Sequence, residues 1–212
     1  MNYEPVQPEA IEQESFRRIR QVVGEHGFPE EVWKVVRRIV HSTADLDFLE
    51  NFRWHPLAVR AGVEALRNGR PVVSDTRMLL AGISTGRLAR LGVEAHCLVA
   101  DPEVAMMARE KNVTRSMAAM DRALPLMEGG IVAIGNAPTA LFRVLELVAR
   151  GEARPALIVG IPVGFVNAAE SKDALVRSSV PYLTVLGPKG GSPVAASAVN
   201  ALAQLALEET PS

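Results

Sequence analysis

Hydrophobic residues recur every three to four positions in the first part of the chain. The spacing holds over residues 10–23 and again over residues 30–41. Such periodicity predicts amphipathic helices, and Pro29 followed by two acidic residues suits the start of the second one. No strand-like run precedes either helix, so we expect a helical segment in front of the main fold.

Beyond residue 70 the pattern changes to short apolar runs that alternate with helical stretches. The apolar runs predict strands at 71–75, 95–100, 131–135, 156–162 and 182–186. The stretches between them predict helices at 78–83, 102–111, 114–127, 139–150, 168–178 and 193–207. Strands without polar alternation are typical of parallel sheets covered on both faces. We therefore expect an α/β fold, a three-layer, doubly wound, flavodoxin-like parallel sheet with an N-terminal helical segment, in one domain over residues 1–212.

Composition narrows the class of function. Lys and Arg number 23 against 24 Asp and Glu, so no overall positive field favours nucleic acid or a membrane surface. Aromatic residues make up 5%, which disfavours a base-stacking surface. The chain opens without a basic and then apolar leader, and no apolar stretch reaches the about 18 residues of a membrane span. We expect a cytoplasmic protein whose partners include neither nucleic acid nor a membrane.

Metal and cofactor motifs are missing from the sequence. The four histidines are widely separated and the single cysteine, Cys97, sits in an apolar run that predicts a buried strand residue. No G-x-G-x-x-G follows the first predicted strand, and Lys189 precedes its paired glycines instead of following them as in a phosphate-binding P-loop. We expect no protein-bound metal and no cofactor.

Ligands of such sheets bind outside the carboxyl ends of the strands. Polar and glycine-rich loops stand there, at 75–77, 135–138, 164–167 and 187–192. Arg77 and Arg115 lie near helix starts beside threonines, and Lys172 and Lys189 lie in or near the later loops. Arginine binds carboxylates in a bidentate way. The pattern suggests a site for a ligand that carries several carboxylates, although a surface ion pair is the alternative for each arginine.

One histidine stands at the predicted end of the second helix. His41 follows Arg37 and Arg38 and precedes small polar residues. Histidine gives or takes a proton near neutral pH. It is our candidate catalytic group, with a structural helix cap as the alternative.

Six stretches in this order resemble precorrin-8X methylmutases, the family that includes cobalt-precorrin-8 methylmutases. The similarity runs from about Ser15 to Ala206. Its carriers are Arg38–Thr43, Asp75–Met78 with Ala81–Ile83, Thr114–Ser116 with Ala118, Ala133–Leu141, Gly160–Lys172 and Gly187–Ser192.

The resemblance implies a homodimer with its active site near the subunit contact. It implies an isomerase that moves a methyl group from C-11 to C-12 of a corrin precursor without a cofactor, with His41 as proton donor to a ring nitrogen. The residues that match substrate-binding positions, or lie in matched loops, are Ser15, Arg38, Ser42, Thr43, Thr76, Arg77, Thr85, Arg115, Asn136, Lys172 and Lys189. Residues 44–48 are slightly closer to the cobalt-dependent branch, and both the metal-free and the cobalt-bearing substrate stay open.

Two other classes of protein compete with this enzyme. A non-catalytic tetrapyrrole carrier would keep the pocket but would have no need of a proton donor such as His41. A flavodoxin-like nucleotide-binding regulator is disfavoured by the missing phosphate loops.

Overall fold

A computed structural model describes residues 7 and 10–208. Within these residues six strands form one sheet in the order β1-β6-β5-β4-β2-β3. The strands are β1 (Phe52–Trp54), β2 (Val72–Ser74), β3 (Ala95–His96), β4 (Ile131–Ile134), β5 (Leu157–Gly160) and β6 (Tyr182–Val185). All neighbours pair in parallel except β1, which is antiparallel to β6. Without β1 the order is that of a flavodoxin-like sheet, so the predicted class of fold is confirmed.

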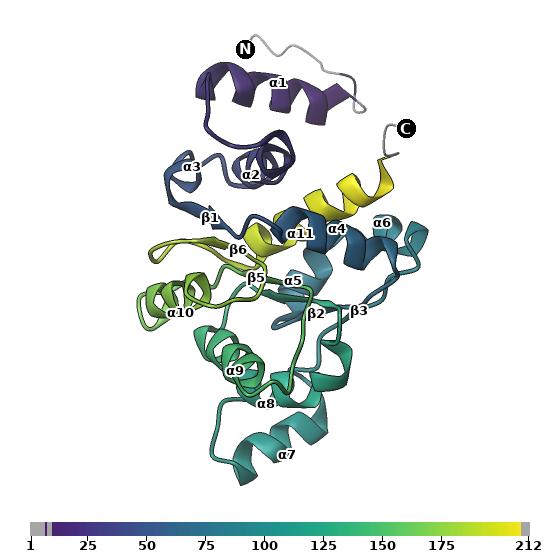
Figure 1. Cartoon of the computed structure of the whole chain (residues 1–212), viewed down its shortest axis with the longest axis vertical. Helices are drawn as coiled ribbons and strands as arrows, with labels where there is room; N and C mark the ends of the chain where they lie inside the picture. The colour runs from purple at the N-terminus through teal and green to yellow at the C-terminus, as the bar shows by residue number, and fades with distance from the viewer. Residues whose placement is uncertain (1–6, 8–9, 209–212) are drawn as a thin grey trace.

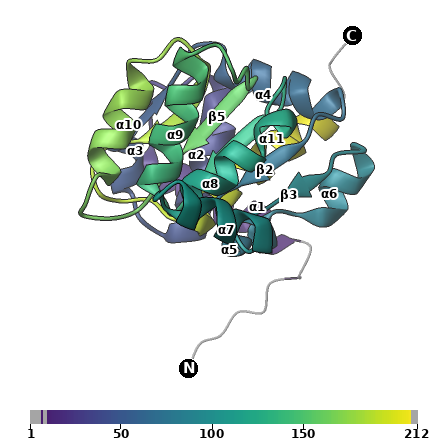
Figure 2. The ribbon, with the colours of Figure 1, turned by 90° about the horizontal axis from the view of Figure 1, so that it is seen from below.

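Helices cover both faces of the sheet (Figures 1 and 2). One face carries α4 (Ala58–Arg67), α5 (Arg77–Gly82), α6 (Thr85–Arg90) and α11 (Ser192–Leu207). The other carries α7 (Pro102–Glu110), α8 (Arg115–Arg122), α9 (Pro138–Ala149) and α10 (Ala168–Val176). Strand residues that alternate in direction supply both hydrophobic cores, as Val132 and Ala133 do in β4.

The N-terminal helices stack outside this three-layer core. α2 (Glu30–Thr43) packs on α11, and α1 (Ile11–Val23) lies across α2 (Figure 1). The short α3 (Asp47–Asn51) then leads into β1. The predicted helical segment is therefore present, and α2 ends beside the loop that follows β6, because Asp45 after α2 lies 2.6 Å from Lys189 of that loop.

α11 is enclosed by helices and sheet, and small side chains make this possible. It contacts α2, α4, α5 and α6 as well as β4 and β5, and its alanines are buried along most of its length. A Cβ atom added at Gly82 of α5 would lie 2.9 Å from the Cβ of Ala196. A helix that is apolar on every side is expected in such a buried place.

Several sequence predictions were wrong in detail. The pattern missed β1, α3 and α6, and the sheet is not entirely parallel because β1 runs against β6. The strand predicted at 95–100 ends at His96, so Cys97 is half-buried outside any strand. The helix predicted over 114–127 stops at Arg122 and is followed by a 3₁₀ turn, η2 (Leu124–Leu126), because Pro125 cannot continue an α-helix.

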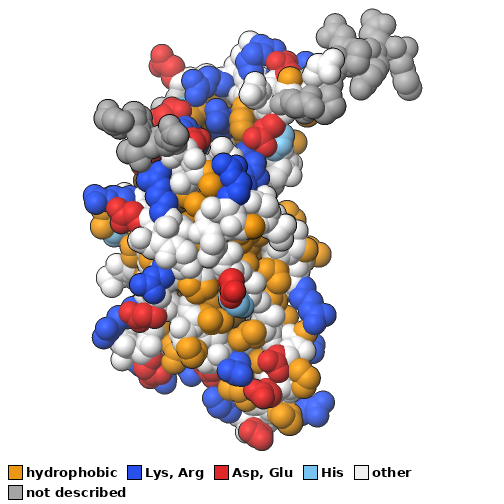
Figure 3. Space-filling view, turned by 90° about the vertical axis from the view of Figure 1, so that its right-hand side faces the viewer, with side chains coloured by type: hydrophobic (Ala, Val, Ile, Leu, Met, Phe, Trp, Pro, Cys, Tyr) orange, Lys and Arg blue, Asp and Glu red, His pale blue; other side chains and the backbone are white. Residues whose placement is uncertain are grey.

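Hydrophobic side chains form a patch on one face of the molecule. Figure 3 shows them gathered in the lower half of that face, with charged side chains around them and also toward the top. Exposed large hydrophobic residues include Met78 of α5 and Met106 of α7. Within residues 7 and 10–208, no helix has the length and apolar character needed to cross a membrane.

Candidate active site

His41 lies in the last turn of α2 and is half-buried. The hydroxyl oxygen of Ser15, from α1, lies 2.7 Å from its Nδ1 atom. The ring of Phe16 meets the imidazole edge-on, with 5.3 Å between ring centroids. Two neighbouring residues of α1 therefore hold the imidazole of α2. Its Nε2 atom has no hydrogen-bond partner among the residues that the structure describes.

The residues after His41 end the helix. The hydroxyls of Ser42 and Thr43 each donate a hydrogen bond of 2.9 Å to the carbonyl oxygen of Ile39. Ala44 follows in the left-handed conformation, with φ 52°. Ser42 is exposed and Thr43 is half-buried. Both predicted substrate contacts thus lie within two positions of His41, and both hydroxyl protons are engaged by the helix itself.

Arg38 joins α2 to α1. Its guanidinium donates two hydrogen bonds to the carboxylate of Glu12, at 2.7 and 3.1 Å, and 12% of its side chain is exposed. Burial raises the pKa of Glu12, but the hydrogen bonds and charge of Arg38 shift the pKa further down, so the net shift is downward. The ion pair keeps α1 against α2. A substrate carboxylate would compete with Glu12 for this arginine.

The two lysines of the predicted site connect three segments. Lys189 Nζ lies 2.6 Å from carboxylate oxygens of both Asp45 and Asp47, which follow α2. Lys172 is fully buried in α10, and its Nζ donates to the backbone carbonyl of Lys189 at 2.8 Å. Burial lowers the pKa of Lys172 to about 8. Lys172 therefore supports the 187–191 loop from beneath, and Lys189 ties that loop to the end of the His41 helix.

A buried carboxylate joins the two central loops. Asp75 directly follows β2, is 0% exposed and accepts backbone N–H bonds of 2.8 to 3.0 Å from residues 135–137. Burial raises its pKa, and the three N–H donors oppose this effect. In a flavodoxin-like sheet these loops flank the switch point where ligands bind. Because Asp75 occupies the N–H groups that would receive a phosphate, the structure disfavours nucleotide binding there.

Thr76 links the loop that begins with Asp75 to α11. Its Oγ1 accepts the N–H of Leu79 and so caps α5, and it lies 2.8 Å from the hydroxyl oxygen of Ser192. Ser192 is the first residue of α11 and directly follows the 187–191 loop. The loop held by the two lysines is therefore also connected to the loop that carries Asp75.

The remaining predicted contacts have exposed side chains. Arg77 and Arg115 begin α5 and α8, and Asn136 lies in the loop between β4 and α9. Arg77 and Arg115 make no side-chain hydrogen bond or ion pair with any residue in the described part of the chain. Both guanidinium groups are thus available to a ligand at the carboxyl ends of the strands.

Thr85 stands apart from these residues. It begins α6, and the preceding Ser84 donates its N–H to the side chain of Asn200 at 2.7 Å. Asn200 lies eight positions beyond Ser192 in α11, which corresponds to about 12 Å along a helix. These links bring neither Thr85 nor Arg115 to the other predicted contacts, but the hydroxyl oxygens of Thr114 and Thr139, 3.1 Å apart, place the start of α8 against the start of α9.

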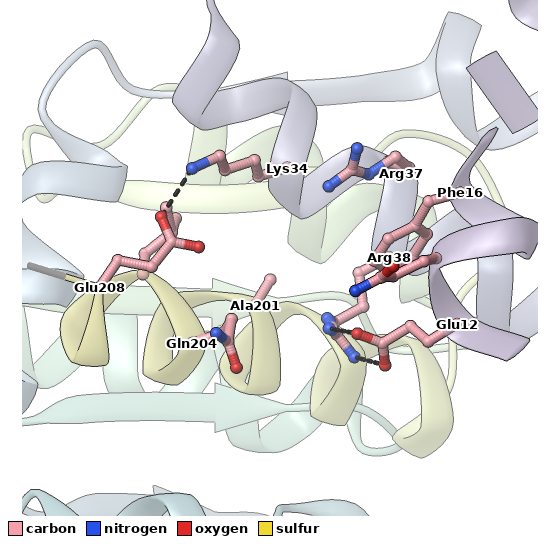
Figure 4. Close-up of a pocket in the computed structure, with 10 residues that line it drawn as sticks. Glu12, Phe16, Lys34, Arg37, Arg38, Ala201, Gln204 and Glu208 are labelled. Atoms are coloured by element: carbon pink, nitrogen blue, oxygen red, sulfur yellow. Dashed lines mark hydrogen bonds and ion pairs between the residues drawn. The ribbon is translucent and has the colours of Figure 1, made fainter. Parts of the chain in front are cut away.

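A pocket lies between α1, α2 and the end of α11 (Figure 4). It is next to the Ser15–His41 contact, since Phe16 borders both. Its lining residues are Glu12, Gln13, Phe16, Lys34, Arg37, Arg38, Ala201, Gln204, Leu205 and Glu208.

Sequence reasoning missed three features of this region. The roles of Asp75 and Ser192 depend on partners 60 and 116 positions away. Arg37 was recognised beside His41 but not as a pocket residue. The sequence offered one usable signal, an aspartate placed directly after an apolar strand. No group of three or more His, Cys, Asp or Glu side chains that could hold a metal ion occurs among the residues described by the structure.

Comparisons with known proteins agree with this arrangement. The family model described as Precorrin-8X methylmutase matches residues 10–205. The chain is 42% identical over 201 residues to the cobalt-precorrin-8 methylmutase of Priestia megaterium, covering 95% of this chain and 89% of that protein. It is 42% identical over 197 residues to the precorrin-8X methylmutase of Pseudomonas aeruginosa, covering 92% and 94% of the two chains. The solved structure of the precorrin-8X methylmutase from Thermus thermophilus is similar with a TM-score of 0.88 and 44% identity, covering 93% of this chain and 96% of that one.

These similarities first define the class of protein, an α/β isomerase that shifts a methyl group within its substrate. The chain belongs to the precorrin-8X methylmutase family, and its reaction is part of cobalamin biosynthesis. Membership favours the enzyme over the carrier and the regulator that the sequence left open.

Proposed function

We propose that this enzyme moves a methyl group from C-11 to C-12 of precorrin-8X or cobalt-precorrin-8, giving hydrogenobyrinate or cobyrinate, and that His41 is its proton donor. The observation that carries the proposal is the 2.7 Å contact between Ser15 and His41 Nδ1. The serine engages one nitrogen of a half-buried imidazole and leaves the other, Nε2, to a substrate.

The proposed reaction is an internal rearrangement. The bond from C-11 to the methyl carbon breaks as the bond to C-12 forms, so no external methyl donor takes part. His41 gives a proton to the ring nitrogen beside the migrating centre, and the substrate returns one proton because the product is an isomer. A positioned general acid contributes about 10²–10⁴-fold in rate. The shape of the bound macrocycle supplies the remainder.

Ser15 is a residue that orients His41 in this proposal. In the imidazolium that a proton donor requires, Nδ1–H donates to the serine oxygen, and the Nε2–H is left to face the substrate. Phe16 limits rotation of the same ring. The resemblance instead makes Ser15 a substrate contact. Loss of an orienting residue should lower kcat, whereas loss of a substrate contact should weaken binding.

The other predicted contacts divide by their present partners. The guanidinium groups of Arg77 and Arg115 have no side-chain partner in the described part of the chain, and we assign them to substrate carboxylates. Lys172 acts through the loop that it supports, since it is buried. Arg38 and Lys189 are paired with chain carboxylates, which a substrate would have to displace.

The choice between the two substrates stays open in this proposal. The relative from Priestia megaterium is named a cobalt-precorrin-8 methylmutase and that from Pseudomonas aeruginosa a precorrin-8X methylmutase. The chain is 42% identical to each. Any cobalt would arrive inside the macrocycle. That the enzyme needs no cofactor and binds no metal through its own residues remains a prediction.

A homodimer, a single domain over residues 1–212 and a cytoplasmic location also stay predictions. The loop between β5 and α10 supports the dimer. It exposes 97% of Phe165 and 77% of Val166, and exposed apolar clusters are typical of protein contacts. The N–H of Gly164 in this loop bonds to the carbonyl of Pro188, so a partner bound here would lie next to the 187–191 loop. Light scattering that shows a stable, active monomer would contradict the dimer.

The test follows both precursors separately by absorbance. Gel-filtered, chelator-treated protein should convert at least one of them without additions. His41→Ala should be slower by about 10² or more while it still binds product and keeps its circular dichroism spectrum. Conversion by well-folded His41→Ala at the wild-type rate would remove His41 from the mechanism. Binding of both precursor and product without conversion by the wild-type chain would indicate a carrier.

A further inference from the structure

Arg37 is the one cation of the α1–α2–α11 pocket without a carboxylate partner among the described residues. The other two cations are paired, Arg38 with Glu12 and Lys34 with Glu208, at 2.7 Å each. The Nε atom of Arg37 is buried and has no hydrogen-bond partner within residues 7 and 10–208. Figure 4 shows its guanidinium directed into the pocket on the side of Lys34, away from Glu12. The pocket therefore holds one unbalanced positive charge.

The surroundings of Arg37 favour an anion. Its guanidinium lies over the ring of Phe16, 4.1 Å from the ring centroid, which blocks one face and leaves its edges as donors. Burial and the charge of Arg20 lower its pKa, so the cation is poorly compensated where it stands. A guanidinium carries five N–H donors in a planar fork that matches a carboxylate. A buried donor left unsatisfied is unfavourable, and an oxyanion would satisfy several donors at once.

The pocket lies beside the reacting centre of the proposed function. Arg37 and His41 are four positions apart on α2, so they share one face with Cβ atoms about 5–6 Å apart. Phe16 contacts both side chains. A macrocycle that presents its ring nitrogen to His41 would have a peripheral side chain within reach of Arg37.

We propose that Arg37 binds a peripheral carboxylate of the corrin precursor while His41 faces the migrating centre. This inference rests on the proposed function, and it adds to that function a binding residue at the α1–α2–α11 pocket. Gln13 and Gln204, which line the same pocket, offer amide groups to the same carboxylate.

The experiment compares Arg37→Gln and Arg37→Lys with wild type in the conversion assay and in titrations with the product. Loss of the ion pair between Arg37 and the carboxylate of the bound corrin should raise both KM and the product Kd of Arg37→Gln by about 10-fold or more. The KM and product Kd of Arg37→Lys should lie between those of wild type and Arg37→Gln, because an ammonium keeps the charge without the bidentate fork. Arg150→Gln is the matched control, since Arg150 is an exposed arginine after α9 on the opposite face of the sheet.

Two outcomes overturn the proposal. KM and product Kd that match wild type in a well-folded Arg37→Gln protein show that no substrate carboxylate binds there. Inorganic phosphate provides the second test: thermal protection of wild type but not of Arg37→Gln, with unchanged KM, would assign the pocket to a free anion. If the wild-type protein converts neither precursor, the proposed function is wrong. Titration with the product then still measures whether Arg37 contributes to binding.

Discussion

Replacement of Ser15 by alanine tests how His41 is held. The variant removes one hydroxyl whose oxygen lies 2.7 Å from Nδ1 and leaves the α1–α2 packing in place through Arg38 and Glu12. A hydrogen bond between neutral groups contributes about 0.5–1.5 kcal/mol, and one to a charged group about 1.5–3 kcal/mol. A proton donor changes its charge during the reaction, so we take about 1.5 kcal/mol, where the two ranges meet. That value corresponds to a rate about 10-fold lower.

The assay measures kcat, KM and product affinity for Ser15→Ala. An orienting role places the loss in kcat and leaves product affinity near wild type. Ser15→Thr, which keeps a hydroxyl, should restore part of the rate. Ser178→Ala is the matched control, because its hydroxyl bonds to a helix carbonyl of α10 at 2.7 Å. A normal kcat with weaker product binding would refute the orienting role and make Ser15 a substrate contact, as the resemblance implies.

Two further predictions concern charged residues of the site. Arg77→Ala and Arg115→Ala should each weaken product binding by about 10-fold or more, because each removes a charged hydrogen-bond donor; unchanged affinity in both, measured by titration, would remove them from the site. The pKa of Lys172 is lowered from 10.5 to about 8, so the unfolded chain binds more protons than the folded chain between these two pH values. The free energy of unfolding should therefore rise as the pH goes from about 8 to 10.5. The total rise is about 3 kcal/mol, at 1.36 kcal/mol per pKa unit. Urea denaturation of wild type and Lys172→Met along this pH series checks the sign, and an equal pH dependence in both proteins would contradict it.

The sequence pattern predicted the strands of the sheet interior well and its edges poorly. β4, β5 and β6 are buried on both faces, and continuous apolar runs reveal such strands. β1 is three residues long with Arg53 exposed, so it has no apolar run to detect. β3 ends after two residues, although the apolar run continues through Cys97. Apolar runs report burial, and burial extends beyond the backbone pairing that defines a strand.

The candidate site was predictable by residue type and less so by partner. His41 stood out because it ends an amphipathic helix, and Arg77 because it follows a strand. The contact of Ser15 with His41 spans 26 positions, and the bonds of Asp75 to residues 135–137 span 60 to 62. Such partners are set by how helices cross and strands pair, which local patterns do not specify. The sequence also could not show that Arg38 and Lys189 already bind carboxylates of the chain.

The Arg37 pocket brings the two ends of the described chain together, and this matters for handling the protein. Glu12 belongs to the first helix and Glu208 follows the last, yet both line that pocket. An affinity tag fused next to Glu12 or Glu208 would therefore lie beside the residues whose effect on substrate affinity is measured. Gly151 lies in an exposed turn after α9, on the other face of the sheet, with a positive φ of 72°. A fluorophore or an immobilisation tag inserted at that turn would leave the pocket unobstructed, and affinities from tagged and untagged protein should then agree.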